Sequence, residues 1–192
     1  MKKITLIILS LFLLNCAGLL FGTKYKYYYF LNKPVSANPS DMNFSDSLIV
    51  IGFFISDKAI NFELKNISNE PIKIIWDEAT IVQFGEAKKV MHSGIKYIDK
   101  NNPQTATVVP SGATITDLVI PTENIYYLSG QYGGWEERDL FPTTDLGKEQ
   151  FRTMIFNCKD QKFTLHLPIV RKDTQLTYSF EFVITDVQEL KK

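Results

Sequence analysis

Two histidines and two cysteines are the side chains of this 192-residue chain best suited to nucleophilic or metal chemistry. His92 precedes Ser93, and Asp77 or Asp99 would be the acid that orients it. However, neighbouring residues of a strand point to opposite faces, and no Gly-x-Ser-x-Gly turn presents the serine. Zinc needs three or four ligands, which the spacing of these residues does not supply. We therefore predict no catalytic residue and no metal site.

Loop carboxylates and the second histidine are the remaining polar candidates. Acidic residues lie within the loop stretches 77–78, 99–102 and 136–139, and none of these stretches has the spacing of a calcium-binding loop. We interpret them as solvated loop charge. His166 alternates with two leucines and is expected on the solvated face of a strand.

Aromatic residues in a glycine-rich segment are the best candidates for binding. Tyr126, Tyr127, Tyr132 and Trp135 lie in the segment 124–147, which shows no regular pattern. Large amphipathic rings beside flexible glycines are typical of recognition loops. Two interpretations remain open: a binding loop, or a loop folded back so that its rings plug one end of the domain.

The N-terminal residues have the pattern of a bacterial secretory signal. Lys2 and Lys3 precede a nearly uninterrupted apolar run over 4–14. The run ends in Leu13-Leu14-Asn15-Cys16, which resembles a relaxed lipobox of bacterial lipoproteins, with larger residues before the cysteine than that family prefers. The resemblance implies that residues 1–15 are a cleaved signal peptide and that Cys16 carries a covalent lipid.

An uncleaved membrane anchor is the alternative for the same segment. Residues 4–22 are almost all apolar, and about 20 such residues span a bilayer. A lipidated Cys16 would leave Cys158 without a partner in the chain, and its apolar neighbours favour a buried free thiol.

Strand patterns dominate the rest of the chain. The segment 48–55 is continuously apolar, which favours a strand buried on both faces, whereas 61–67 and 176–185 alternate polar and apolar residues. Residues 151–156 are predicted as a strand and 145–151 as a helical turn. Many short strands separated by turn signals predict an all-β fold, and we favour an immunoglobulin-like antiparallel β-sandwich preceded by the N-terminal hydrophobic signal helix.

Two stretches strengthen the extracytoplasmic interpretation. Residues 66–73 resemble the strand-turn-strand opening of extracytoplasmic sandwich modules, and the segment 76–113 is similar to a pattern found in uncharacterised bacterial lipoproteins. The expected organisation is a signal peptide (1–15), a lipidated tether with an aromatic-basic lead-in segment (16–46) and a β-sandwich domain (47–188). The aromatic-basic residues 24–30 are either membrane-proximal or a first strand.

Composition limits the function further. The chain has 21 basic and 21 acidic residues and no basic block, which argues against nucleic-acid binding. We expect a non-catalytic binding or accessory module held on the bilayer of the bacterial cell envelope, with an envelope or extracellular protein as its partner. No cofactor is expected other than the lipid on Cys16. The alternatives are an envelope hydrolase that uses loop acids and a structural subunit of a membrane complex.

Overall fold

The computed structural model describes residues 22–34 and 42–191, most of which lie in antiparallel strands. The predicted signal peptide and Cys16 lie outside the described residues. The described elements are, in chain order, β1 (Tyr25–Lys33), β2 (Asn43–Ser45), β3 (Ile49–Ile55), β4 (Ile60–Asn66), β5 (Ile72–Ile74), η1 (Trp76–Glu78), β6 (Thr80–Gln83), β7 (Glu86–His92), η2 (Tyr97–Asp99), β8 (Thr107–Val109), β9 (Thr114–Pro121), η3 (Thr122–Asn124), β10 (Ile125–Leu128), β11 (Gly134–Glu137), α2 (Glu149–Phe156), β12 (Lys162–Arg171) and β13 (Thr174–Glu189).

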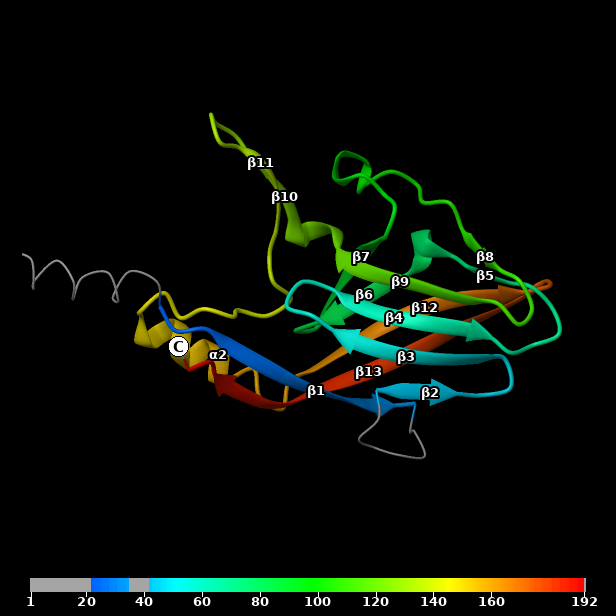
Figure 1. The fold of residues 1–192 in the computed structure, drawn as a ribbon, viewed down its shortest axis with the longest axis horizontal. Coiled ribbons are helices and arrows are strands. Elements are labelled where there is room, and N and C mark those ends of the chain that lie inside the picture. The colour runs from blue at the N-terminus through cyan, green and yellow to red at the C-terminus, as the bar shows by residue number, and fades with distance from the viewer. Residues whose placement is uncertain (1–21, 35–41, 192) are drawn as a thin grey trace, which may run out of the picture.

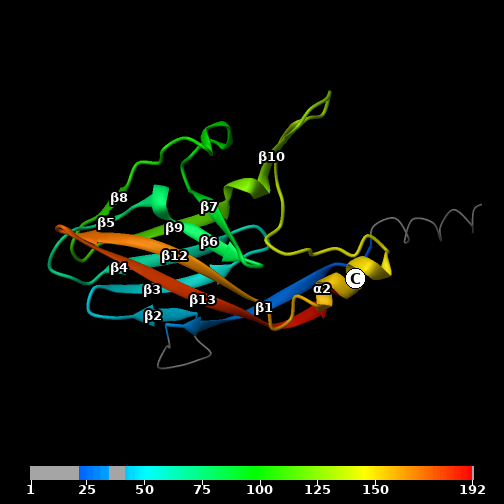
Figure 2. The ribbon, with the colours of Figure 1, turned by 180° about the vertical axis from the view of Figure 1, so that it is seen from behind.

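Hydrogen bonds join most of the described strands into one sheet with the order β1-β13-β12-β6-β7-β9-β4-β3-β2, and β5 lies between β12 and β8. All of these pairings are antiparallel. The sheet has two halves, β1-β13-β12-β6 and β9-β4-β3-β2. β7 links them because it pairs with β6 on one side and with β9 on the other. Seen from front and back, β12 and β13 lie across the molecule from β3 and β4 (Figures 1 and 2). The prediction of an all-β antiparallel fold is confirmed.

The core forms where the alternating faces of the two halves meet. Phe180 and Phe182 on β13 are fully buried, as the alternation of this strand predicts. Phe53 on β3 reaches them from the other half, with its ring centroid 4.8 Å from that of Phe180 and 5.1 Å from that of Phe182. Burial of one such ring is worth about 1.5–3 kcal/mol, so these contacts contribute strongly to holding the halves together.

The prediction that the strand over 48–55 is buried on both faces is wrong. Side chains of β3 alternate, and Val50 and Phe54 face solvent, with Phe54 70% exposed. An antiparallel sheet commonly packs one face on the core and leaves the other solvated. Within the described residues, no layer covers the outer face of β3, so its apolar residues there stay exposed.

The aromatic-basic lead-in segment is a strand of the sheet. Tyr25 and Tyr27 on β1 are buried, and β1 pairs with β13 along most of its length. The Tyr27 hydroxyl donates to the carbonyl of Pro142 at 2.6 Å. Of the two interpretations of this segment, the first-strand interpretation is therefore confirmed, and the sheet begins before residue 47.

The segment predicted as a strand over 151–156 is helical instead. It belongs to α2, which buries Ile155, and the buried Cys158 lies three residues after Ile155, in the turn that follows the helix. This spacing places both side chains on one helical face against the core. Cys158 is a buried free thiol, as predicted, and burial raises its pKa. Across 22–34 and 42–191, no helix combines the length and the apolar character that crossing a membrane requires.

Asn66 ties three segments together at the end of β4. Its side chain is completely buried and donates to the carbonyls of Glu70 at 2.7 Å and Val109 at 3.0 Å. Its carbonyl oxygen accepts from the backbone and hydroxyl groups of Ser68. A buried amide with all of these partners fixes the turn between β4 and β5 and holds it against β8.

We expect Asn66→Ala to lower the free energy of unfolding by about 2–3 kcal/mol, because the carbonyls of Val109 and Glu70, the first buried and the second partly buried, and Ser68 would lose their partner. Asn69→Ala is the matched control, since Asn69 is exposed in the same turn and its loss should cost less than about 0.5 kcal/mol. Chemical denaturation of the two variants measures both values. Equal stabilities of the two variants would contradict the role of Asn66.

Candidate functional site

The segment over 124–147, which shows no regular sequence pattern, contains a two-stranded hairpin. β10 and β11 pair with each other, with Tyr127 opposite Trp135. The hairpin stands away from the main sheet, to one side of the long axis of the molecule (Figure 1). Glycine is required at its tip: Gly130 has a φ of +128°, and a Cβ on Gly133 would lie 2.2 Å from the carbonyl oxygen of Leu128. The glycines therefore form the turn of a projecting arm.

The base of the hairpin is held firmly against the sheet. Ile125, its first residue, is buried in a small apolar cluster with Ala59, Met91 and Ile120. The backbone amide of Arg138 donates to the carbonyl of Asn124 at 2.7 Å, which closes the hairpin at its origin. The arm is thus fixed at one end only.

Glu137 adds polar contacts at the same base. It accepts a short hydrogen bond from the hydroxyl of Tyr97 on η2 and forms an ion pair with Lys58 at 3.7 Å. The hydrogen bond to this carboxylate, together with burial, raises the pKa of Tyr97 to about 12. Tyr97 therefore stays protonated and donates to Glu137 throughout the physiological pH range.

Three of the four predicted aromatic residues are presented outward along the arm, whereas Tyr126 is half-buried. Tyr132 at the tip is 93% exposed, Tyr127 is 60% exposed and Trp135 is 38% exposed. The rings of Tyr127 and Trp135 meet edge to face at 5.5 Å, and the guanidinium of Arg138 lies 4.8 Å from the ring of Tyr126. The plug interpretation is wrong for Tyr127 and Tyr132, since buried plugs would not be exposed. That these residues bind a partner stays a prediction.

His92 has an acidic neighbour, but not one of those considered from sequence. Its Nδ1 lies 3.2 Å from Oδ2 of Asp117, and its ring stacks on Trp76 at 4.3 Å. Asp77 and Asp99 instead accept from Gln104 and Asn102. Sequence reasoning missed the pair because only the register of β7 against β9, with His92 opposite Val119, brings the two residues together.

Both carboxylate oxygens of Asp117 have hydrogen-bond partners. Its Oδ1 accepts from the backbone amides of Ser93 at 2.9 Å and Leu118 at 2.8 Å. Burial acts to raise the pKa of Asp117, but the hydrogen bonds from His92, Ser93 and Leu118 outweigh it and hold the pKa below its ordinary value. The pair of His92 and Asp117 is therefore a fixed bridge between β7 and β9.

The other polar candidates lie apart. His166 is half-buried on β12, where its Nδ1 lies 2.9 Å from the hydroxyl of Ser179 on β13. In the part of the chain that the structure describes, no three His, Cys, Asp or Glu side chains are grouped to hold a metal ion.

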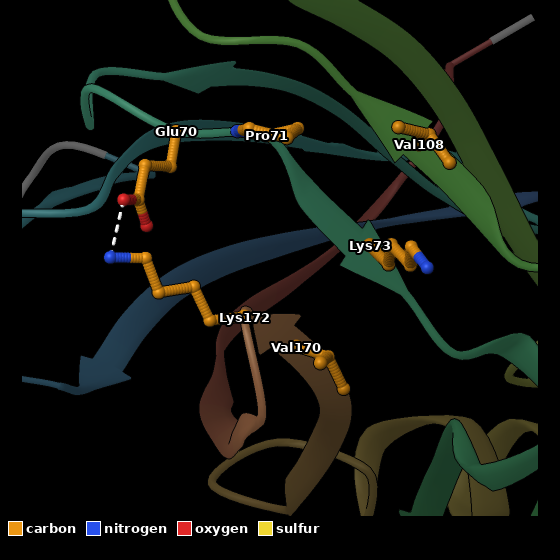
Figure 3. A pocket seen from close by; sticks show the side chains of 6 residues that line it. All are labelled: Glu70, Pro71, Lys73, Val108, Val170 and Lys172. Carbon is orange, nitrogen blue, oxygen red and sulfur yellow. Dashed lines mark ion pairs between the residues drawn. The ribbon is translucent and has the colours of Figure 1, made fainter.

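A shallow hollow of about 380 Å³ lies at the end of the sheet opposite α2. Register explains it, because Val108, Lys73 and Val170 stand side by side on the outer faces of β8, β5 and β12. The ammonium group of Lys172 reaches across to pair with Glu70 (Figure 3). The alternation of the strands could have revealed these outward aliphatic residues, but not that three strands align them. The walls of the hollow are mainly aliphatic, and its rim is charged.

Comparisons of the chain with known protein families, with characterised proteins and with solved structures find no match.

We expect the carboxylate of Asp117 to make stability depend on acid. Because its pKa is lower in the folded chain than in the unfolded chain, it stabilises the fold above the ordinary value of 3.8. This contribution is lost as the pH falls through the lowered folded pKa. Asp117→Asn should lower the free energy of unfolding at pH 7 by about 1–3 kcal/mol and weaken the loss of stability below pH 4.

Melting temperatures measured about every half pH unit between pH 2 and pH 7 test this expectation. Asp173→Asn is the control, since Asp173 lies exposed in the turn between β12 and β13 and should leave the profile unchanged. If the Asp117→Asn profile ran parallel to that of the wild-type chain, the stabilising role of the charge would be refuted.

Proposed function

We propose that the chain is a lipid-anchored protein of the bacterial cell envelope that acts as a non-catalytic binding or accessory module, with the β10–β11 hairpin as its partner-binding surface. The observation that carries the proposal is the outward presentation of Tyr127, Tyr132 and Trp135 on a hairpin fixed only at its base. The partner it fits is an envelope or extracellular protein with an apolar cleft.

The chemistry of the arm supports a protein partner. Tyrosine and tryptophan lose little conformational freedom on binding and bury large areas, which is why they dominate the energetics of protein interfaces. Tyr132 at the tip is available to enter a pocket first, while the packing of Trp135 on Tyr127 and Tyr97 orders its ring before contact. Such preorganisation reduces the entropy lost on association.

The N-terminal residues support the proposed location. The Leu13-Leu14-Asn15-Cys16 stretch, after two lysines and an apolar run, supports cleavage before Cys16 and its acylation. Several acyl chains together hold a protein firmly on a bilayer. In this proposal the immunoglobulin-like sandwich is the finer description of the nearly closed sheet, whose two halves face each other across the phenylalanine core.

The hairpin is tested by the double substitution of Tyr132→Ala and Trp135→Ala. Both side chains lie outside the core, so the free energy of unfolding should change by less than about 1 kcal/mol. Loss of two interface aromatics should weaken partner binding by about 2 kcal/mol or more, roughly thirtyfold. Affinity capture from membranes in mild detergent, with thermal melting in parallel, measures both effects.

Phe54→Ala serves as the control for this test, because Phe54 is 70% exposed but lies on β3, away from the hairpin. It should leave both stability and capture unchanged. A hairpin variant that captures its partner as well as the wild-type chain would sink the proposal.

The anchor is tested by Cys16→Ala. Without the thiol no lipid can be attached, so palmitate labelling should vanish and the chain should keep its signal segment. Cys158→Ala is the control, since its thiol is buried in the domain and should not be acylated. Globomycin, which blocks removal of the signal from lipoproteins, should give the wild-type chain the same larger size. Unchanged size and membrane fractionation of Cys16→Ala would favour the uncleaved helix instead.

A further inference from the structure

Apolar side chains are exposed together at the end of the molecule where the described chain begins. They come from three separate segments, and we call them the anchor-side patch. Their exposed fractions are between 41% and 59%, and the members are Leu146, Met154, Phe156 and Leu190. Clustered exposed apolar groups mark a surface that is covered by something else.

The first described residues hold this patch in place. Asp145 accepts from the backbone amide of Thr23 at 2.7 Å and from the hydroxyl of Tyr25 at 2.9 Å. The backbone amide of Leu190 donates to the carbonyl of Lys24 at 2.8 Å. The rings of Phe156 and Tyr25 meet edge to face at 5.5 Å.

Gly22 is also in direct contact with this region. Its φ is +59°, and a Cβ there would lie 2.6 Å from the backbone nitrogen of Leu146. The point where the chain joins the domain is therefore next to the patch. Figure 1 shows the same arrangement, with α2 and the beginning of β1 together at one end of the long axis.

The distance to the proposed lipid is short. Six residue steps separate Cys16 from Gly22, and an extended chain spans at most about 3.3–3.6 Å per residue, or roughly 20 Å in all. A lipid on Cys16 thus keeps this end of the domain within about 20 Å of the bilayer. The hollow beside Val108 lies at the opposite end of the long axis.

Two cations beside aromatic rings, Lys148 at the N-cap of α2 and Arg152 within the helix, suit a headgroup layer. The ammonium group of Lys148 lies 5.7 Å from the ring centroid of Phe151, and the guanidinium of Arg152 lies 6.0 Å from that of Phe156. Arg152 also lies 4.0 Å from Glu189. Aromatic rings with cationic neighbours favour the membrane interface, where rings sit at headgroup level and cations meet anionic lipid.

We infer that the anchor-side patch docks the domain on the bilayer surface, so that the lipid and the protein contact the membrane together. This inference rests on the lipid anchor proposed above. When docked, the domain contacts the membrane with one end of its long axis, and the other end points away from the bilayer. The β10–β11 hairpin then projects to the side of this axis, where an envelope protein can reach it.

Spin labels on the full lipidated chain test the docking. Met154→Cys carries the label at the patch, and Val108→Cys is the matched control, an exposed aliphatic position at the far end. The buried thiol of Cys158, with its raised pKa, reacts slowly at neutral pH, and Cys16 is blocked by lipid. The protein is reconstituted in phosphatidylethanolamine and phosphatidylglycerol vesicles.

We expect the label at residue 154 to be several-fold more accessible to oxygen, relative to a water-soluble nickel chelate, than the label at residue 108. A label introduced by Leu190→Cys, on a different segment, should report the same immersion. Thermal melting checks that each labelled chain is folded.

The outcomes separate the two proposals. A chain whose mass includes the lipid and that stays on the vesicles, but whose labels at 154 and 108 are equally aqueous, overturns the docking alone. A chain without the lipid mass that washes off the vesicles contradicts the anchor, and the docking falls with it.

Discussion

The contact of Phe53 with Phe180 and Phe182 is the interaction on which the rest of the structure depends. Hydrogen bonds connect the two halves of the sheet through β7, at one side of the molecule. Across the interior, the halves meet through side chains, and these three rings lie where β3 faces β13. Because Phe182 also stacks on Phe163 at 5.2 Å, the same cluster ties β12 into the core. Loss of this packing would leave the two halves of the sheet with exposed apolar faces.

The β10–β11 hairpin and α2 are short elements that the sheet holds in position at its edges. The hairpin has its own two-stranded pairing, yet its orientation comes from Ile125 in a small apolar cluster and from the Tyr97 contact with Glu137. α2 likewise owes its place to Ile155 and Cys158, which are buried against the same core. Both surfaces proposed to meet other molecules are therefore additions to the sheet, and each can be altered without removing a residue of the phenylalanine cluster.

Strand alternation made most of the fold predictable from sequence, and its failures have physical causes. The faces of β12 and β13 could be predicted because polar and apolar residues alternate over most of 162–167 and 178–182. The segment over 151–156 is helical although Thr153, Ile155 and the phenylalanines at 151 and 156 favour strands, and the burial at 155 and 158 has helical spacing. The hairpin aromatics stood out by composition, but their pairing and projection depend on turn geometry. The bridge between His92 and Asp117 was unpredictable, since it depends on register between strands far apart in sequence.

The pairing of β1 with β13 has a consequence for how the chain reaches this structure. Tyr25 lies opposite Glu189, so the first described strand finds its partner only after the other described strands have been synthesised. Contacts between such distant residues form slowly, because a long loop must be closed before they can stabilise anything. A nascent chain that still lacks β13 also lacks Phe180 and Phe182, and with them the centre of the core. The topology therefore leaves the phenylalanine core incomplete until β13 is available, and the apolar faces of the strands made before it stay uncovered until then.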